Sequence, residues 1–174
     1  KTPPIEPFVE AVAAMVGGSD WPEGDLRISA VDCQSGDLQL WTMASGVGLD
    51  RAVTSSIAVP AVIGPVPVAG RLYMDGGVDS PNHADLLVGS GVPKAVFIGP
   101  LAGPSTVPAL DALLQRERQH LEEAGIPLFQ VVPGPNYASI GMEAMNAGHA
   151  PAALEIGRAD GRAAAPALEE FLSS

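Results

Sequence analysis

The chain has 174 residues, enough for one domain with a full hydrophobic core, and it carries 20 Asp and Glu residues against 9 Lys and Arg. This acidic balance argues against binding to the phosphate backbone of nucleic acids and against electrostatic attraction to anionic membranes. No apolar run approaches the roughly 18 residues of a membrane span, and the single cysteine, Cys33, excludes an internal disulfide. We therefore expect a cytoplasmic protein, and peripheral contact with membranes through apolar side chains stays open.

The first half of the chain alternates predicted helices with predicted hairpins. Apolar residues at helical spacing predict a helix over 8–16 that ends at two glycines. Two apolar runs joined by a Gln-Ser-Gly turn predict a hairpin over 25–43. A short helix should follow over 50–58, because a proline stops it soon after. A second hairpin is predicted over 65–77, turning at Ala69 and Gly70.

The second half of the chain has the pattern strand, helix, strand, helix. The continuous apolar run over 94–101 is typical of a strand buried on both faces of a parallel sheet. An amphipathic helix over 107–125 leads to another such strand over 127–134, and one or two helices should follow over 138–172. This order predicts an α/β fold in which a mostly parallel sheet is flanked by helices.

The most distinctive short motif is Asp75-Gly76-Gly77, at the end of a predicted strand. A carboxylate at such a strand end can orient or deprotonate a neighbouring group, or bind a cation. Glycines allow the backbone to turn sharply and to approach another group closely. The residues alone leave a simpler interpretation open, in which Asp75 only caps a tight turn.

The segment around this motif resembles the patatin-like phospholipase family. The matching residues are Ala52, Val53, Ser55, Ser56, Ala58, Val59, Pro60, Pro65, Val66, Gly70, Tyr73, Asp75, Gly76 and Gly77. The resemblance implies a three-layer α/β/α fold and a lipid acyl hydrolase of the phospholipase A or esterase type. It implies a Ser–Asp dyad with Asp75 as the catalytic base, supported by Gly76 and Gly77, and neither a metal nor an organic cofactor.

The nucleophile of that family, which lies in a G-x-S-x-G motif, has no counterpart here. The serines nearest to glycines are Ser19, Ser45 and Ser90, and none has glycine two residues away on both sides. We therefore interpret residues 1–174 as the C-terminal portion of one patatin-like domain, with Lys1 an internal or processed end. The expected partners are an N-terminal fragment that carries the serine and a lipid or other ester substrate. The alternative is a non-catalytic α/β binding or regulatory domain derived from that scaffold.

Several other residues have both a functional and a structural interpretation. The cluster of Asp79, Asn82, His83 and Asp85 could bind a cation, but a solvated loop is the simpler interpretation, and His83 could be either a base or a loop residue. Structural roles are expected for the remaining candidates. We expect buried hydrogen bonding for Ser55 and Ser56, a buried inert thiol for Cys33, core packing for Met142 and Met145, and a solvated helix face for 115–123.

Overall fold

The computed structural model describes residues 4–100, 108–139 and 146–174. The chain divides into two compact units, Lys1–Pro81 and Asn82–Ser174, which are described separately below. In the described residues, no helix is both long enough and apolar enough to span a membrane.

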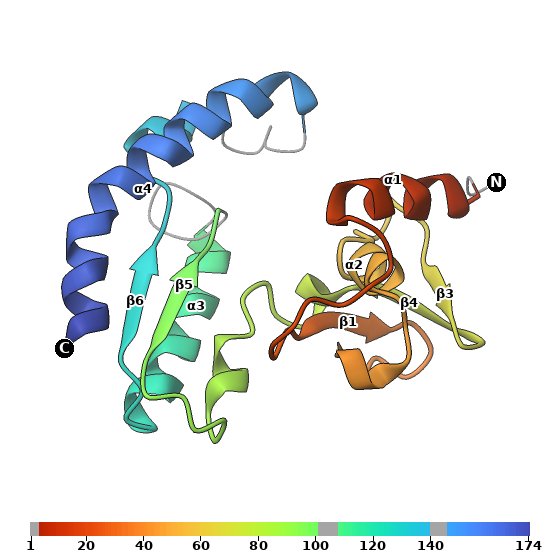
Figure 1. Cartoon of the computed structure of the whole chain (residues 1–174), viewed down its shortest axis with the longest axis horizontal. Helices are drawn as coiled ribbons and strands as arrows, with labels where there is room; N and C mark the ends of the chain where they lie inside the picture. The colour runs from red at the N-terminus through yellow and green to blue at the C-terminus, as the bar shows by residue number, and fades with distance from the viewer. Residues whose placement is uncertain (1–3, 101–107, 140–145) are drawn as a thin grey trace. The chain divides into compact units, whose positions relative to one another are not determined.

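The first unit is a four-stranded antiparallel sheet with two helices (Figure 1). Its strands are β1 (Ile28–Asp32), β2 (Leu38–Trp41), β3 (Val66–Val68) and β4 (Arg71–Asp75), in the order β2-β1-β4-β3. The helix α2 (Leu49–Ser56) contacts β1, β3 and β4, and α1 (Glu6–Val16) packs on α2. The core therefore lies between the sheet and α2. Its buried residues are Ala30, Trp41, Ala52, Ala58, Val66, Val68 and Tyr73.

Local sequence signals explain most of these elements. Helix α1 ends at Gly17, whose φ of 88° is a left-handed conformation that glycine adopts without strain. The hairpin of β3 and β4 turns at Ala69 and Gly70, with φ values of 49° and 82°. Both predicted hairpins and both predicted helices of this unit are confirmed.

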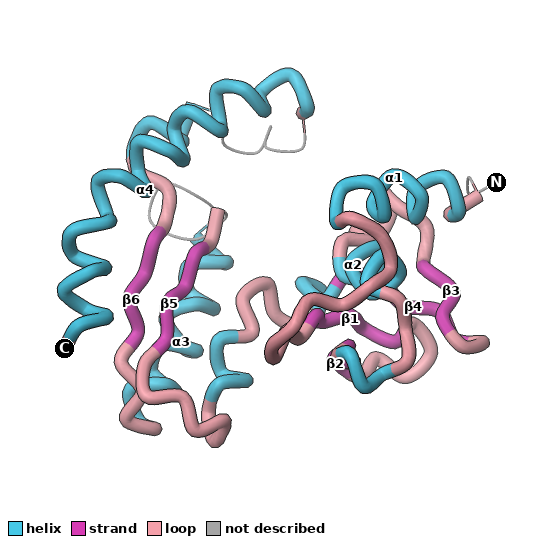
Figure 2. Tube along the Cα trace, viewed as in Figure 1, coloured by secondary structure: helices cyan, strands magenta, loops and turns pink. Residues whose placement is uncertain are grey.

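The second unit contains a two-stranded parallel sheet and two long helices, whose path is followed most easily in Figure 2. Strand β5 (Ala95–Ile98) pairs with β6 (Leu128–Val131), and helix α3 (Pro108–Glu123) connects them. Helix α4 (Ala150–Ser173) contacts β6 and has a proline, Pro166, in its interior. The buried core residues of this unit are Ala84, Ala95, Leu121 and Ile126.

Short 3-10 helices connect the larger elements in the described parts of the two units. They are η1 (Met43–Ser45), η2 (Gly76–Val78), η3 (Ala84–Leu87), η4 (Pro135–Ser139) and η6 (Ala147–His149), the last directly before α4. Of these, η2 carries the glycines of the Asp-Gly-Gly motif, so it positions the candidate site.

The prediction of a three-layer α/β/α fold with a mostly parallel sheet is wrong. The two predicted hairpins belong to one antiparallel sheet, because β1 pairs antiparallel with β4, with Ala30 opposite Asp75. The parallel pair of β5 and β6 is separate and has two strands. Its first strand is not buried on both faces, since Val96 is 39% and Ile98 73% exposed. Continuous apolar character in this strand therefore reflects apolar side chains on an open face rather than burial in a larger sheet.

Candidate functional site around Asp75

Asp75 is the last residue of β4 and is held from both the main chain and the side chain. Its backbone N–H donates to the carbonyl oxygen of Ala58, at 3.1 Å. Its carboxylate oxygen Oδ1 accepts a hydrogen bond of 2.7 Å from the N–H of Gly77, so the side chain caps η2. The side chain is half-buried. The carboxylate is therefore fixed in direction without being sealed inside the unit.

The two glycines of the motif have different roles. Gly76 is buried against β1, and a Cβ at this position would lie 2.7 Å from the carbonyl oxygen of Ser29. Such a separation is too short for any side chain, so the close approach requires glycine. Gly77 is exposed, and a Cβ there would lie 3.0 Å from Oδ1 of Asp75. The first glycine allows the backbone to pack on Ser29, and the second leaves room for the capping carboxylate.

The turn-capping interpretation of Asp75 is thus confirmed as a description of its local contact. A carboxylate has about four lone-pair sites, and the bond from Gly77 uses one of them. The cap is therefore compatible with a second contact from another group. The carboxylate of Asp75 is oriented and accessible, so it can accept a proton or a hydrogen bond.

The residues that follow the motif do not form a metal site in the described part of the chain. Asp79 and Asp85 are exposed, and they fall in different compact units. His83 has a φ of 53° and precedes η3, where it is half-buried. Among the described residues, no three His, Cys, Asp or Glu side chains gather closely enough to hold a metal ion.

The expected structural role of Ser55 is confirmed. Its side chain is fully buried, its hydroxyl donates to the carbonyl oxygen of Ala52 at 2.8 Å, and it accepts a bond of 2.9 Å from Trp41 Nε1. The ring of Trp41 meets that of Tyr73 edge to face, with centroids 4.8 Å apart. Ser55 thus links α2 to the aromatic core of the sheet. Its neighbour Ser56, the last residue of α2, is half-buried.

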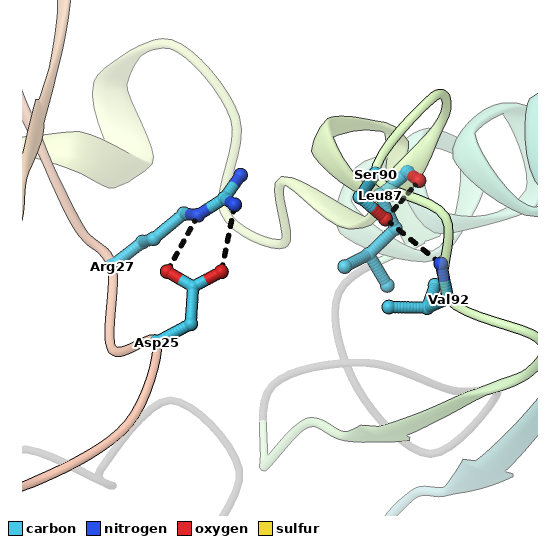
Figure 3. A network of polar contacts seen from close by, with 5 residues as sticks. All are labelled: Asp25, Arg27, Leu87, Ser90 and Val92. Atoms are coloured by element: carbon cyan, nitrogen blue, oxygen red, sulfur yellow. Dashed lines mark hydrogen bonds and ion pairs between the residues drawn. The ribbon is translucent and has the colours of Figure 1, made fainter.

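Two of the serines beside glycines have local structural contacts. Ser45 Oγ accepts from the N–H of Thr42, at 2.9 Å, and closes a short capping motif. Ser90 Oγ donates to the carbonyl oxygen of Leu87 at 2.6 Å and accepts from the N–H of Val92, as Figure 3 shows. Ser90 therefore stabilises a turn before β5. Ser90 precedes a strand, whereas the serine of a nucleophile elbow follows one. Ser45 lies between β2 and α2, but Met43 and Val47 stand where the elbow has its two glycines.

The environment of Cys33 differs from the prediction. Strand β1 ends at Asp32, so Cys33 lies in the hairpin turn and is exposed rather than buried. The pKa of its thiol is raised, first by desolvation of the sulfur and then by the negative charge of Asp32. The thiol is accessible, but a raised pKa keeps it protonated and hence a poor nucleophile.

The mixed-charge stretch over 115–123 is largely the predicted solvated face. Besides the core residue Leu121, Glu117 is buried, and its Oε2 accepts a 2.9 Å hydrogen bond from the N–H of Ala84. This bond ties α3 to η3. The predicted packing of Met142 and Met145 lies outside the described residues.

One charged pair of the first unit was missed at the sequence level. Asp32 is buried, pairs with Arg71 of β4, and accepts from the N–H groups of Gln34 and Ser35. These contacts, the bond from Arg71 foremost, lower the pKa of the Asp32 carboxyl to about 2. The Ser35-Gly36 pair three residues after Asp32 is a recognisable turn signal. The pairing of Asp32 with a residue of another hairpin has no local signal. A second pair, Asp25 with Arg27, is exposed and local (Figure 3).

No protein-family model matches the chain, and no curated protein matches it significantly.

Proposed function

We propose that this chain is the aspartate-bearing part of a patatin-like lipid acyl hydrolase, in which Asp75 is the base of a Ser–Asp dyad. The observation that carries the proposal is the half-buried carboxylate of Asp75, which the N–H of Gly77 orients at the end of β4. The motif residues and the preceding segment from Ala52 to Pro60 supply the resemblance on which the proposal also depends. The serine would come from a segment outside residues 1–174, in the same polypeptide or in a second one.

In this proposal the chemistry is acyl transfer to serine followed by hydrolysis. The carboxylate of Asp75 takes the proton of the serine hydroxyl as the serine oxygen attacks the ester carbonyl. The protonated Asp75 then gives its proton to the leaving alkoxide, and an acyl-serine remains. A water molecule, deprotonated by the same carboxylate, attacks the acyl-serine and releases the fatty acid. The proton returns to the serine oxygen, so Asp75 ends as it began.

The geometry around Asp75 suits this role in one specific way. A base that receives and returns a proton must keep its direction through two steps. The bond from Gly77 and the packing of Gly76 on Ser29 fix that direction without enclosing the carboxylate. Residues 1–174 by themselves, without that serine, should not hydrolyse esters.

The experiment is active-site labelling of the chain purified from cells that produce it naturally. A fluorophosphonate probe should label a serine in a G-x-S-x-G peptide, either of the polypeptide that contains residues 1–174 or of a second one that co-purifies with it. Asp75→Asn should reduce ester hydrolysis on the order of 10⁴-fold, as loss of an activating aspartate does in another serine hydrolase. The segment with the labelled serine should stay associated with residues 1–174 in that variant.

Asp37→Asn provides the matched control, because it removes the same formal charge from an exposed turn of the same unit. It should leave labelling and hydrolysis unchanged. The hydrolase proposal fails if no G-x-S-x-G serine is labelled in the polypeptide that contains residues 1–174 or in one that co-purifies with it. It also fails if Asp75→Asn hydrolyses esters as fast as the parent. The non-catalytic binding domain would then take its place.

A further inference from the structure

A pocket of about 340 Å³ lies in the second unit, at the carboxyl ends of the parallel strands β5 and β6. It is lined by Ile98, Gly99 and Pro100 after β5, by Val131, Val132 and Pro133 after β6, and by Tyr137, Ala153, Gly157 and Asp160. The carboxyl end of parallel strands is where α/β proteins commonly bind their ligands. The size falls at the lower end of the range for small-molecule sites.

The wall formed by α4 leaves the pocket open because its residues are small. Ala153, Gly157 and Asp160 lie four and three residues apart, so they share one face of the helix. A Cβ added at Gly157 would meet no atom within 4 Å. Glycine is therefore not required there by any backbone contact, and its effect is to keep space free. Glycine in a helix interior costs about 1 kcal/mol relative to alanine, so this space comes at some expense of helix stability.

Few polar groups line the pocket, and the charged side chain among its lining residues is the carboxylate of Asp160. Asp160 Oδ2 accepts a 3.0 Å hydrogen bond from the N–H of Gly134, which fixes the carboxylate beside the strand ends. A Cβ at Gly134 would lie 2.9 Å from Asp160 Oδ1, so a side chain at this position would require the carboxylate to shift. Tyr137 adds a hydroxyl. None of the ten lining residues is a Lys, Arg or His, so Asp160 sets the electrostatic preference.

We propose that this pocket binds a small amphipathic molecule, with an alkyl body and a hydrogen-bond-donating end group that is a hydroxyl or an ammonium. The alkyl body contacts Ile98, Val131 and Val132, and the end group donates to the carboxylate of Asp160. A carboxylate-ended ligand is disfavoured, because two like charges would meet in a largely apolar setting. This binding site is independent of the role proposed for Asp75.

The test is a binding titration of the whole chain with three probes that share the same alkyl chain: 1-octanol, octylammonium and octanoate. Methyl resonances of Ile98, Val131 and Val132 report binding at the pocket. We expect saturable shifts with octanol and octylammonium, and binding of octanoate at least tenfold weaker. Asp160→Asn keeps a carbonyl oxygen that can accept the hydrogen bond from Gly134 and removes the negative charge. It should therefore reduce the difference in affinity between octylammonium and octanoate.

Gly157→Leu fills the pocket and should weaken octylammonium binding at least tenfold. Gly161→Leu is the matched control: it lies one turn further along α4, is exposed, has no atom within 4 Å of its added Cβ, and does not line the pocket. The affinity of Gly161→Leu for octylammonium should lie within twofold of that of the parent. Circular dichroism verifies that both variants fold, and Gly157→Ala, which a helix tolerates well, should give a smaller loss in the same direction.

Three results would overturn the proposal. The first is octylammonium binding to Gly157→Leu as tightly as to Gly161→Leu. The second is equal affinity of the parent for octanoate and octylammonium. The third is the absence of saturable shifts at the three reporter residues with either donor probe.

Discussion

The ammonium nitrogen of Lys94 lies 2.8 Å from the carbonyl oxygen of Phe171, 77 residues further along the chain. It also lies 5.3 Å from the centroid of the Phe171 ring. That ring in turn packs on Phe129 of β6, with 5.5 Å between centroids. A cation from the residue before β5 thus holds the end of α4, where free carbonyl groups and the helix dipole favour positive charge.

Replacing this cation should loosen the end of α4. We expect Lys94→Met to lower the free energy of opening of the last helical turns by about 1–2 kcal/mol, because a charged hydrogen bond and the dipole interaction are both lost. Hydrogen exchange of the amides near Phe171 measures this loss. Lys94→Arg keeps the charge, and its free energy of opening should fall by less than half as much as that of Lys94→Met. Equal exchange rates in the parent and Lys94→Met would contradict the assignment.

The two glycines after Asp75 should respond differently to alanine. Gly76→Ala places a methyl group against the backbone carbonyl of Ser29, which cannot move aside, and should cost about 1–3 kcal/mol in the free energy of unfolding. Gly77→Ala meets a side-chain oxygen of Asp75, which can rotate. It should therefore cost less stability than Gly76→Ala. Urea unfolding compares the two variants, and equal losses would show that the contact with Ser29 does not determine the need for glycine.

Removing the hydroxyl of Ser55 should destabilise the first unit. Ser55→Ala leaves the buried N–H of Trp41 without its acceptor, which costs about 1–3 kcal/mol. Tryptophan fluorescence during urea unfolding measures the change. Ser56→Ala, one residue further along α2, is the control and should stay within about 0.5 kcal/mol of the parent. Similar behaviour of the two variants would mean that the hydrogen bond contributes little.

The pairing of Asp32 with Arg71 should appear in the pH dependence of stability. The pKa of Asp32 is lowered from 3.8 to about 2, chiefly by the bond from Arg71, so folding favours the charged form. Its contribution is complete above 3.8 and is lost as the pH falls through about 2. Thermal unfolding across this range should therefore show a smaller fall in stability for Asp32→Asn than for the parent. Asp37→Asn, in the same hairpin, should show the same dependence of stability on pH as the parent over that range.

The sequence by itself determined the local elements of this protein. Helix α1 ends at Gly17, helix α3 is followed by Gly125 with a φ of 73°, and the β3–β4 hairpin turns at Ala69 and Gly70. Each of these helix ends and turns depends on residues that are only a few positions apart in the sequence. Helical spacing and left-handed glycines act at that range, so they can be recognised without knowing the fold. The turn at Asp75 belongs to the same class, since its capping bond joins residues two positions apart.

The tertiary structure decided which strands pair and which residues meet. The antiparallel pairing of β1 with β4 joins two hairpins and brings Gly76 against Ser29 and Arg71 against Asp32. The sequence led us to expect a parallel sheet instead. A strand's own residues specify which side chains lie on each face, but not which strand pairs with it or in which direction. The same reason explains Cys33, whose exposure follows from the residue at which β1 ends. The pocket beside Asp160 likewise exists because α4 passes the ends of β5 and β6.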